Sequence, residues 1–581
     1  MAANALDRRL TQLEAARYRF GRKEAASVVK LLNRLNAAHF PDPASLIRFH
    51  EALLFLRAFP QGPAVVRATE RILNSFHRKV KALRKAGADM DDFEPIEVSG
   101  IAGTQMEDTL SFDVASWLIK RMPGKVEIAW DNYEPGRELG TTGPRFIPLL
   151  EDDAYVEADT PWRRWLETAS GRRGSDSARL VAASLAPAWL IRRFAELPLP
   201  PIQKAELYES LRVPLRWNLG NSVITRTRNW KPVRSTYYHN EPLISRSQVS
   251  LADELARPPV DLTRLSRNQG DEVMDMIREI MLVRYRELYG TTLGDPRSVV
   301  RADVGRGVSI YLWNLPADRR LPLRAYVAGL TLKNGVPINY IEAIGLCAWM
   351  EVGFNTFYTF RGGEAGWIYA QVLRCLCHLM GTTCVSVYPY QLGHDNEEAI
   401  ESGAFWFYRK LGFRPGRADL QRLAEREESR IAAATKLGKT KYRTPASTLR
   451  RLAAGHAFYE LPGSEVGAWD SFSTRSIGLR VNRRMAREFQ GDSGRIRKQS
   501  VSSVARMLKV DTSSWTSSER ASFESLAVVL GLVPDLAAWK REEKEALVRI
   551  IRSKSKADEM VYLHLTQRHE RFREALLSLR S

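Results

Sequence analysis

A tight turn near the middle of the chain separates two runs in which apolar and other residues alternate. The runs are RAYVAGLTL and PINYIEAIGLC, and the turn between them is Lys333-Asn334-Gly335. Asn-Gly accepts the positive φ angles of a two-residue hairpin more readily than other dipeptides do. The pattern therefore predicts an antiparallel strand pair here. GVSIYLWNL, just before it, predicts a third strand of the same sheet.

The elements around this hairpin alternate between helix and strand. A long amphipathic helix, GDEVMDMIREIMLVRYRELYG, precedes the strands. After them, WMEVGFNTFYTF is expected to connect the last strand to a glycine-rich turn. The helix WIYAQVLRCLCHLMG, the buried strand TTCVSVYPY, the helix EEAIESGAFWFYRKLG and the short strand FRP follow. This order predicts a mixed sheet with helices between residues 261 and 417.

The flanking regions predict a multidomain α+β protein. Three- and four-residue apolar spacing predicts a helical bundle in residues 1–95, where Pro41-Asp42-Pro43 marks a break. Residues 96–260 combine strand-like KVEIAWDNYE with helical stretches and predict a mixed α/β region. Residues 418–581 are again helical and rich in arginine and lysine. A chain of 581 residues is too long for a single core, which favours several domains.

Charge and cysteine content narrow the possible environments and partners. The formal net charge of +20 favours polyanionic partners, such as tRNA or single-stranded nucleic acid, although dispersed charge also serves solubility alone. The chain has four cysteines without paired C-x-x-C spacing, which indicates free thiols in a reducing cytoplasm and no zinc site. No run of eighteen apolar residues is present, so no membrane insertion is expected.

Two segments of the central region resemble the GNAT superfamily of N-acyltransferases. The first, Phe360-Arg361-Gly362-Gly363-Glu364-Ala365-Gly366, is similar to the family's acyl-CoA loop, R/Q-x-x-G-x-G/A. The second, Ala404-Phe405-Trp406-Phe407-Tyr408-Arg409-Lys410-Leu411-Gly412-Phe413, is similar to its A-x-x-L-Y-x-K-x-G-F ending. The resemblance covers roughly residues 261–416. It implies a GNAT-like central sheet and acetyl-CoA or another acyl-CoA as the donor, with no metal.

The resemblance implies that the first segment binds the donor's pyrophosphate. A helix N-terminus offers free N–H groups and a partial positive charge, which suit a phosphate. The expected binding residues are Arg361, Gly362, Gly363, Glu364, Ala365 and Gly366. Glu364 replaces the first consensus glycine, and a carboxylate beside a pyrophosphate would repel it.

The resemblance also implies the catalytic groups. In the family a tyrosine of the later helix protonates the departing thiolate, and by position that residue is Tyr408. Its aromatic neighbours leave the alternative of a core aromatic residue. A glutamate on the strand before the loop often acts as base. Glu342 is the nearest match, Glu351 competes with it, and either is otherwise an outward-facing strand residue.

Three further segments contain groups that could bind ligands. The acidic cluster around Glu151-Asp152-Asp153 could hold a cation, but it lacks ligand spacing and is more typical of a solvated loop. SVITRTRNWKPVRSTYYH interleaves basic and aromatic residues, as single-strand binding needs, although alternation also describes an amphipathic strand pair. His394 could act as a base, but the run that follows it is typical of a helix N-cap.

Three functions are consistent with the sequence. The first is an acyl-CoA-dependent N-acyltransferase that acts on an amine acceptor. The second is a non-catalytic scaffold of the same fold that binds nucleic acid through its basic flanks. The third is a transferase that uses aminoacyl-tRNA as its donor. No G-x-S-x-G, H-E-x-x-H or Walker motif points to another chemistry.

Overall fold

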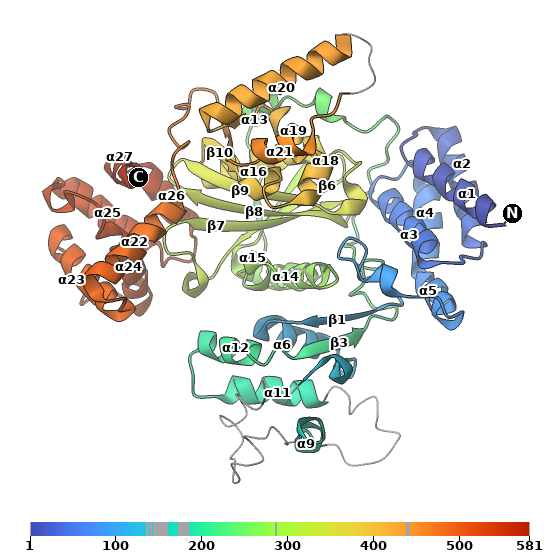
Figure 1. The fold of residues 1–581 in the computed structure, drawn as a ribbon, viewed down its shortest axis with the longest axis horizontal. Coiled ribbons are helices and arrows are strands. Elements are labelled where there is room, and N and C mark those ends of the chain that lie inside the picture. Colours follow the sequence, from blue (N-terminus) through green and yellow to red (C-terminus); the bar gives the residue numbers. More distant parts are fainter. Residues whose placement is uncertain are drawn as a thin grey trace. The chain divides into compact units, whose positions relative to one another are not determined.

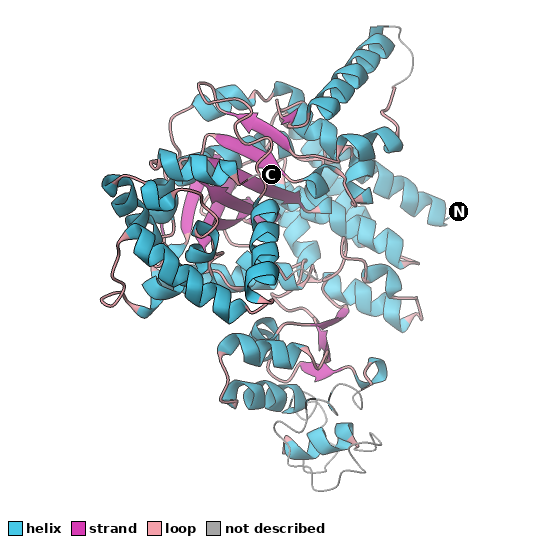
Figure 2. Cartoon of the chain, turned by 60° about the vertical axis from the view of Figure 1, so that its left-hand side comes forward, coloured by secondary structure: helices cyan, strands magenta, loops and turns pink. Residues whose placement is uncertain are grey.

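The computed structural model describes residues 2–134, 161–171, 185–284, 287–436 and 442–579, with Leu139 and Thr142. The fold is mixed α+β, with a large mixed sheet and many helices (Figures 1 and 2). The chain divides into two compact units, and each is described by itself. Unit 1 comprises Met1–Val233, Tyr238–Pro242 and Val273–Thr292; unit 2 comprises Arg234–Tyr237, Leu243–Glu272 and Leu293–Ser581.

Unit 1 begins with helices, as the apolar spacing predicts. They are α1 (Ala2–Ala16), α2 (Arg22–Asn36), α3 (Pro43–Ala58), α4 (Pro63–Asn74) and α5 (Phe76–Lys85), followed by η1 (Asp91–Phe93). The expected break before α3 is a helix start. The Asp42 side chain accepts a hydrogen bond of 2.7 Å from the Ser45 N–H, and Pro43 occupies the first turn, where a missing N–H costs nothing.

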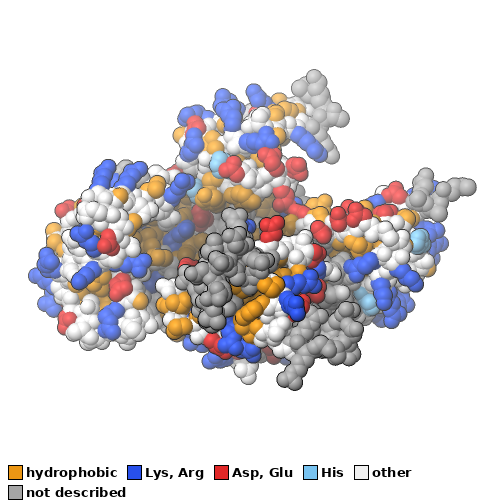
Figure 3. All heavy atoms as spheres, turned by 60° about the horizontal axis from the view of Figure 1, so that its bottom comes forward, with side chains coloured by type: hydrophobic (Ala, Val, Ile, Leu, Met, Phe, Trp, Pro, Cys, Tyr) orange, Lys and Arg blue, Asp and Glu red, His pale blue; other side chains and the backbone are white. Residues whose placement is uncertain are grey.

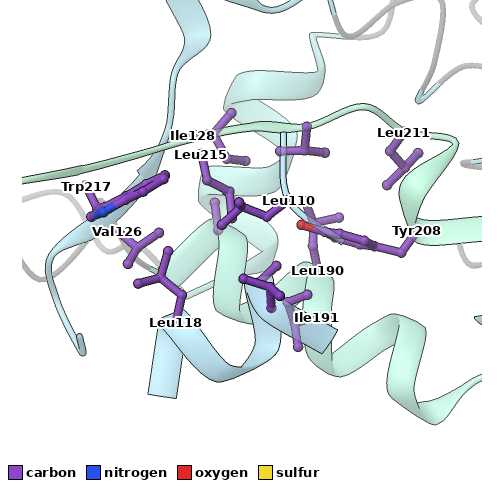
Figure 4. Close-up of a cluster of buried hydrophobic side chains, with 14 of the residues drawn as sticks. Leu110, Leu118, Val126, Ile128, Leu190, Ile191, Tyr208, Leu211, Leu215 and Trp217 are labelled. Carbon is purple, nitrogen blue, oxygen red and sulfur yellow. The ribbon is translucent and has the colours of Figure 1, made fainter. Parts of the chain in front are cut away.

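The rest of unit 1 is a small sheet covered by helices. Its elements are β1 (Gln105–Thr109), α6 (Phe112–Arg121), β2 (Val126–Ile128), η2 (Trp130–Asn132), α9 (Trp162–Ala169), α11 (Leu185–Glu196), α12 (Pro201–Glu209), β3 (Pro214–Asn218) and α15 (Tyr289–Thr292). The strand order is β1-β3-β2, and all pairs are antiparallel. Figure 4 shows the core, in which Trp217 and Leu215 of β3 lie near Leu118 of α6 and Leu190 of α11. Burial of this apolar surface stabilises the unit.

Unit 2 is built around one nine-stranded sheet. Its strands are β4 (Thr263–Arg264), β5 (Val300–Gly305), β6 (Val308–Asn314), β7 (Ala325–Lys333), β8 (Val336–Leu346), β9 (Trp349–Thr356), β10 (Cys384–Val387), β11 (Arg414–Pro415) and β12 (Ala457–Glu460). Their order is β11-β12-β10-β9-β8-β7-β6-β5-β4. The pair β9–β10 is parallel and the other pairs are antiparallel, so the sheet is mixed.

The predicted hairpin is confirmed. Lys333 pairs with Val336, which leaves Asn334 and Gly335 as the two turn residues, with φ of 48° and 80°. The Asn334 side chain also accepts a hydrogen bond of 2.8 Å from the Tyr237 N–H. The turn therefore fixes both the strand register and the segment around Tyr237.

The strand β9 differs from the sequence expectation. The residues WMEVGFNT were expected to connect a strand to the glycine-rich loop, but they form β9, which pairs with β8 along its whole length. The strand before the loop therefore contains Glu351, while Glu342 lies one strand further away, on β8. After β9 and η8 (Tyr358–Phe360), α16 (Ala365–Met380) crosses over to the parallel strand β10.

Helices complete unit 2. Before β10 and around the sheet lie η5 (Arg246–Gln248), α13 (Leu251–Ala256), η6 (Pro296–Ser298) and η7 (Ala317–Arg319); α14 (Arg267–Leu282) contains the unit boundary. After β10 come α17 (Pro389–Leu392), α18 (Glu397–Ser402), α19 (Ala404–Arg409), α20 (Ala418–Lys436), α21 (Ala446–Leu452), α22 (Thr474–Phe489), α23 (Ser493–Leu508), α24 (Ser517–Leu530), η9 (Leu536–Ala538), α25 (Arg541–Ser553), α26 (Met560–Gln567) and α27 (Glu570–Ser578).

Two features bear on the expected domain boundaries. β12 lies beyond residue 417 but pairs with β10 and β11, so the expected C-terminal helical region contributes a strand to the central sheet. The residues Val273–Thr292, expected in the central domain, belong to unit 1. The four-part division itself stays a prediction.

Candidate active site

The glycine-rich loop leads directly into α16 and leaves several N–H groups available. Glu364 is the N-cap residue of α16, but its side chain makes no capping hydrogen bond. Within the described residues, the N–H groups of Gly362, Ala365 and Gly366 have no recorded acceptor, whereas the Gly363 N–H donates to the Phe360 carbonyl at 2.9 Å. The first turn thus offers free donors and a partial positive charge.

Gly366 has a packing role that the sequence did not predict. A Cβ added there would lie 3.2–3.3 Å from the Cγ, Cα and Cβ atoms of Arg246, closer than such contacts normally are. Glycine therefore lets η5 approach the first turn of α16. The loop remains accessible on its other side, where Gly362 is exposed and Gly363 and Ala365 are half-buried.

Glu364 belongs to a buried cluster of ion pairs. Its carboxylate is fully buried, pairs with Arg306, and lies 3.4 Å from the Lys333 Nζ; it also accepts from the Ile244 N–H at 3.2 Å. Burial alone raises the pKa of Glu364, but the Arg306 hydrogen bond and the Lys333 charge outweigh it and hold the pKa below its usual range. The resemblance implies that this carboxylate lies beside a pyrophosphate. In the structure it points inward instead, where it pairs with two cations.

Lys333 and Arg306 also contact aromatic rings in this cluster. Burial lowers the pKa of Lys333 to about 8. Its Nζ lies 5.0 Å from the centre of the Tyr237 ring, and the Arg306 guanidinium lies 5.2 Å from that ring and 5.9 Å from the Trp367 ring. The cluster thus connects β7, the β5–β6 turn and α16.

Arg361 belongs to the loop itself, Arg246 packs against Gly366, and Lys410 lies close enough to Arg246 to feel its charge. Arg361 pairs with Glu398 at 2.5 Å, and both side chains are partly exposed. Arg246 donates to the Trp406 carbonyl at 3.3 Å. Burial, with the charge of Arg246 as a second cause, lowers the pKa of Lys410. Positive charge therefore gathers near free N–H donors, which suits an anion.

Tyr408 lies against the first turns of α16. Its buried ring contacts Tyr369 of α16, with ring centres 5.7 Å apart, and Phe413 at the same distance. Burial raises the pKa of Tyr408, so its hydroxyl is protonated at neutral pH. Tyr369 in turn contacts Phe354 of β9 at 4.8 Å. The second GNAT-like segment thus lies next to the helix that follows the first.

The expected long helix around Tyr408 is two helices. Gly403 has φ of 68° and separates α18 from α19. Asn396 caps α18 by accepting a hydrogen bond of 3.2 Å from the Ala399 N–H, which confirms the N-cap interpretation of this segment. His394 lies in the loop before the cap, half exposed, 3.6 Å from Asp395.

Glu342 lies on one face of the sheet, beside the part of β9 that extends beyond the end of β10. It pairs across to Gly353 of β9, and the Tyr326 hydroxyl donates a hydrogen bond to its carboxylate. A Cβ built on Gly353 would lie 3.9 Å from the Gln391 Nε2. β10 pairs with β9 only from Trp349 to Glu351, so Val352–Thr356 continue without it.

The same face of the sheet carries a second acid–base pair that the sequence reading missed. The Glu351 carboxylate lies 3.2 Å from the His456 Nε2 and 3.5 Å from the Arg324 guanidinium. The His456 ring is a third exposed and packs against Tyr388, with ring centres 5.3 Å apart. His456 lies 105 residues from Glu351, beyond α20 and α21, so no local pattern connected them.

Other sequence candidates have structural explanations or lie outside the described residues. The acidic cluster at 151–159 lies outside them. In the basic-aromatic segment no strand forms; Arg226 is buried and lies 3.7 Å from Glu51, and the Arg57 guanidinium lies over the Trp230 ring. The part of the segment around Arg226 and Trp230 therefore packs against other residues of unit 1. The amphipathic strand pair expected there is wrong.

The described part of the chain has neither a cluster of metal-binding side chains nor a helix that could span a membrane. It contains no group of three or more His, Cys, Asp or Glu residues arranged to hold a metal ion. None of its helices has the length and apolar character to cross a bilayer. The four cysteines are free, and burial raises their pKa values, to about 12 for Cys347, Cys375 and Cys377. These thiols are poor nucleophiles at neutral pH.

Comparison with known proteins gives no assignment: no family model, curated protein or solved structure matches this chain. Function is therefore argued from the residues and their geometry.

Proposed function

We propose that the region around residues 261–416 is an acyl-CoA-dependent N-acyltransferase of the GNAT type, most simply an acetyltransferase acting on an amine. The observation that carries the proposal is the arrangement around α16. Two parallel strands, β9 and β10, are joined through this helix. β9 extends to Thr356, beyond the end of β10 at Val387, and the Tyr408 ring lies against the first turns of the helix. The part of β9 beyond the end of β10 could receive the thioester end of an extended donor.

The donor's phosphates would bind at the accessible side of the loop. The free N–H groups of Gly362 and Ala365 and the guanidinium of Arg361 supply hydrogen bonds and charge there. Glu364 is not among these groups, because its carboxylate is occupied by Arg306 and Lys333. This arrangement removes the repulsion that Glu364 would otherwise exert on a pyrophosphate.

Acyl transfer would take place beside the part of β9 that extends beyond β10. The amine nitrogen forms a bond to the thioester carbonyl carbon, and the carbon–sulfur bond breaks. The Glu342 carboxylate accepts the proton that the amine loses, and the Tyr408 hydroxyl protonates the departing thiolate. Glu342 and the Tyr408–Tyr369–Phe354 contacts lie on opposite faces of β8 and β9, because Gly353 and Phe354 alternate along β9. The donor and the amine would therefore have to meet beside the part of β9 that extends beyond β10.

Replacing Arg361 with Gln should weaken acetyl-CoA binding. A charge-assisted hydrogen bond to a phosphate contributes about 1.5 kcal/mol, so the dissociation constant should rise roughly tenfold. Isothermal titration calorimetry with acetyl-CoA measures it. Glu398→Gln is the matched control, because it removes the partner of Arg361 and leaves the cation in place. Absence of acetyl-CoA binding by the unmodified protein would exclude this donor.

A second candidate function is nucleic-acid binding, either as a scaffold or with aminoacyl-tRNA as donor. The observation that favours it is a basic stripe formed by Arg495, Lys498 and Arg506 of α23 and by Lys509, which follows the helix as its C-cap residue. The four residues are exposed, and the three within the helix share one face, opposite the buried Ile496, Val504 and Leu508. The residues 473–510 contain ten basic and two acidic side chains. In Figure 3 the charged side chains of the C-terminal helices, at the left, are more often Lys and Arg (blue) than Asp and Glu (red).

Neutralising the stripe should reduce both nucleic-acid affinity and its salt dependence. Replacing the four basic residues with Gln should lower the slope of log K against log salt by about three, since each phosphate contact contributes roughly 0.7–0.9. Fluorescence anisotropy with tRNA and with a single-stranded oligonucleotide measures the slope. The control removes the same charge from exposed positions of α1 and α2, namely Arg8, Arg9, Lys23 and Lys30. Equal losses in both variants would indicate a general charge effect.

A further inference from the structure

A small open cavity in unit 2 is lined mainly by arginines. It has a volume of about 270 Å³ and lies between the start of α20 and the end of α21. Its charged lining consists of Arg417, Arg422, Arg426, Arg451 and Asp419. Leu420, Leu423 and Ala454 complete it. The sequence reading placed no function in this segment.

Three of these arginines have no carboxylate partner in the described structure. Arg417 is paired with Asp419, at 2.7 Å. No ion pair is recorded for Arg422, Arg426 or Arg451, and all three are exposed. Arg422 and Arg426 are four residues apart on α20, where like charges repel one another. The protein thus holds uncompensated positive charge around one cavity.

Other arginines on the same two helices form ion pairs with carboxylates, whereas the three without such a partner among the described residues all line the cavity. Arg430 of α20 pairs with Glu427 at 2.7 Å, and Arg450 of α21 pairs with Glu397 at 2.7 Å. Arg450 and Arg451 are adjacent, yet only Arg451 lines the cavity. Gly455 helps to keep α21 against α20, because a Cβ there would lie 2.9 Å from the Leu420 Cδ1 and 3.2 Å from the Arg417 Cδ.

We propose that this cavity binds the phosphate group of a phosphorylated ligand. Guanidinium groups match phosphate oxygens through paired hydrogen bonds, and a dianionic phosphate would relieve the repulsion among the three unpaired arginines. The start of α20 adds the partial positive charge of a helix N-terminus. The cavity is large enough for a phosphate or pyrophosphate, and it is open, so the rest of the ligand extends outward.

The cavity lining is close in the sequence to a residue that contacts the central sheet. Ala454, in the lining, is two residues before His456, which pairs with Glu351 of β9. The phosphate site does not depend on the proposed acyl transfer, because its residues lie outside the donor loop.

Calorimetric titration of the full chain with inorganic pyrophosphate tests the proposal. The unmodified protein should bind it, and Arg422→Gln combined with Arg451→Gln should weaken binding at least tenfold. Arg450→Gln is the matched control and should leave binding unchanged, because Arg450 is outside the cavity. Thermal unfolding of each variant establishes that it is folded. Equal weakening by Arg450→Gln, or no binding by the unmodified protein, would overturn the proposal.

Two paired titrations distinguish the source of the phosphate. Acetyl-CoA is compared with its analogue lacking the 3′-phosphate, and a 5′-phosphorylated oligonucleotide with its unphosphorylated form. A preference for the phosphorylated member of either pair that disappears in the double variant supports the site and identifies its ligand class. A preference that persists in the double variant contradicts the assignment to this cavity. Failure of the acyl transfer alone would not change either outcome.

Discussion

Glu364→Gln should destabilise unit 2 by about 3–5 kcal/mol, the usual result of removing one member of a buried ion pair. The Lys333 side chain is fully buried, and its pKa of about 8 keeps most of it charged at pH 7. Glutamine preserves the shape of Glu364 but not its charge, so Lys333 and the partly buried Arg306 would lose their shared counter-charge. The free energy of unfolding, measured by urea denaturation, gives the magnitude.

Glu398→Gln provides the comparison for this effect. It also removes a carboxylate from an arginine near the start of α16, but Glu398 is 47% exposed and Arg361 is 35% exposed. Solvent screens such a pair, and its loss should cost at most about 1 kcal/mol. A similar loss of unfolding free energy in the two variants would show that the buried Glu364 ion pairs contribute no more to stability than an exposed pair does.

The pH dependence separates the charge of Glu364 from its packing. Since its folded pKa lies below the ordinary value of 4.5, ionised Glu364 contributes stability that is fully present above that value. This contribution is lost as the pH falls through the folded pKa, where the protonated side chain resembles glutamine. The difference in unfolding free energy between the unmodified protein and Glu364→Gln should stay constant from pH 7 to about pH 5 and then shrink. A pH-independent difference would indicate a packing effect.

The elements that local chemistry determines could be predicted from the sequence. Asn334 and Gly335 form the expected hairpin because their positive φ angles depend on those two residues alone. The helix α3 begins where Pro41-Asp42-Pro43 predicts a break. The helix after the glycine-rich loop is likewise present as α16. In each of these segments the determining residues are neighbours in the chain.

The features that were missed depend on partners far away in the sequence. Glu364 is separated from Lys333 by 31 residues and from Arg306 by 58, so nothing near it indicated a buried ion pair. α20 and α21 separate β12 from the rest of the sheet in the sequence. For this reason neither the strand nor the Glu351–His456 pair could be predicted from neighbouring residues. β9 was mistaken for a connection because its glycine and polar residues weaken the alternation.

Tyr408→Phe should lower the turnover of acetyl-CoA by about 100-fold, because a positioned general acid typically contributes that much or more. The substitution removes one hydroxyl and leaves the ring that packs against Tyr369 and Phe413. Acetyl-CoA affinity should change less than about twofold, since the hydroxyl acts only as the thiolate leaves. Thiol release from acetyl-CoA with a panel of primary amines gives the rate, and calorimetry gives the affinity. An unchanged rate would remove Tyr408 from the mechanism.

Tyr369→Phe is the matched control, because it removes a hydroxyl from the adjoining ring. The Tyr369 hydroxyl is buried without a hydrogen-bond partner in the described structure, so its removal should stabilise the protein by about 1 kcal/mol and leave turnover unchanged. If Tyr369→Phe abolished turnover while Tyr408→Phe did not, the acid would be the tyrosine on α16 itself. Burial raises the pKa of both phenols, so each stays protonated at neutral pH, and only position relative to the thioester can decide between them. The two substitutions therefore compare position directly, with chemistry and burial held nearly constant.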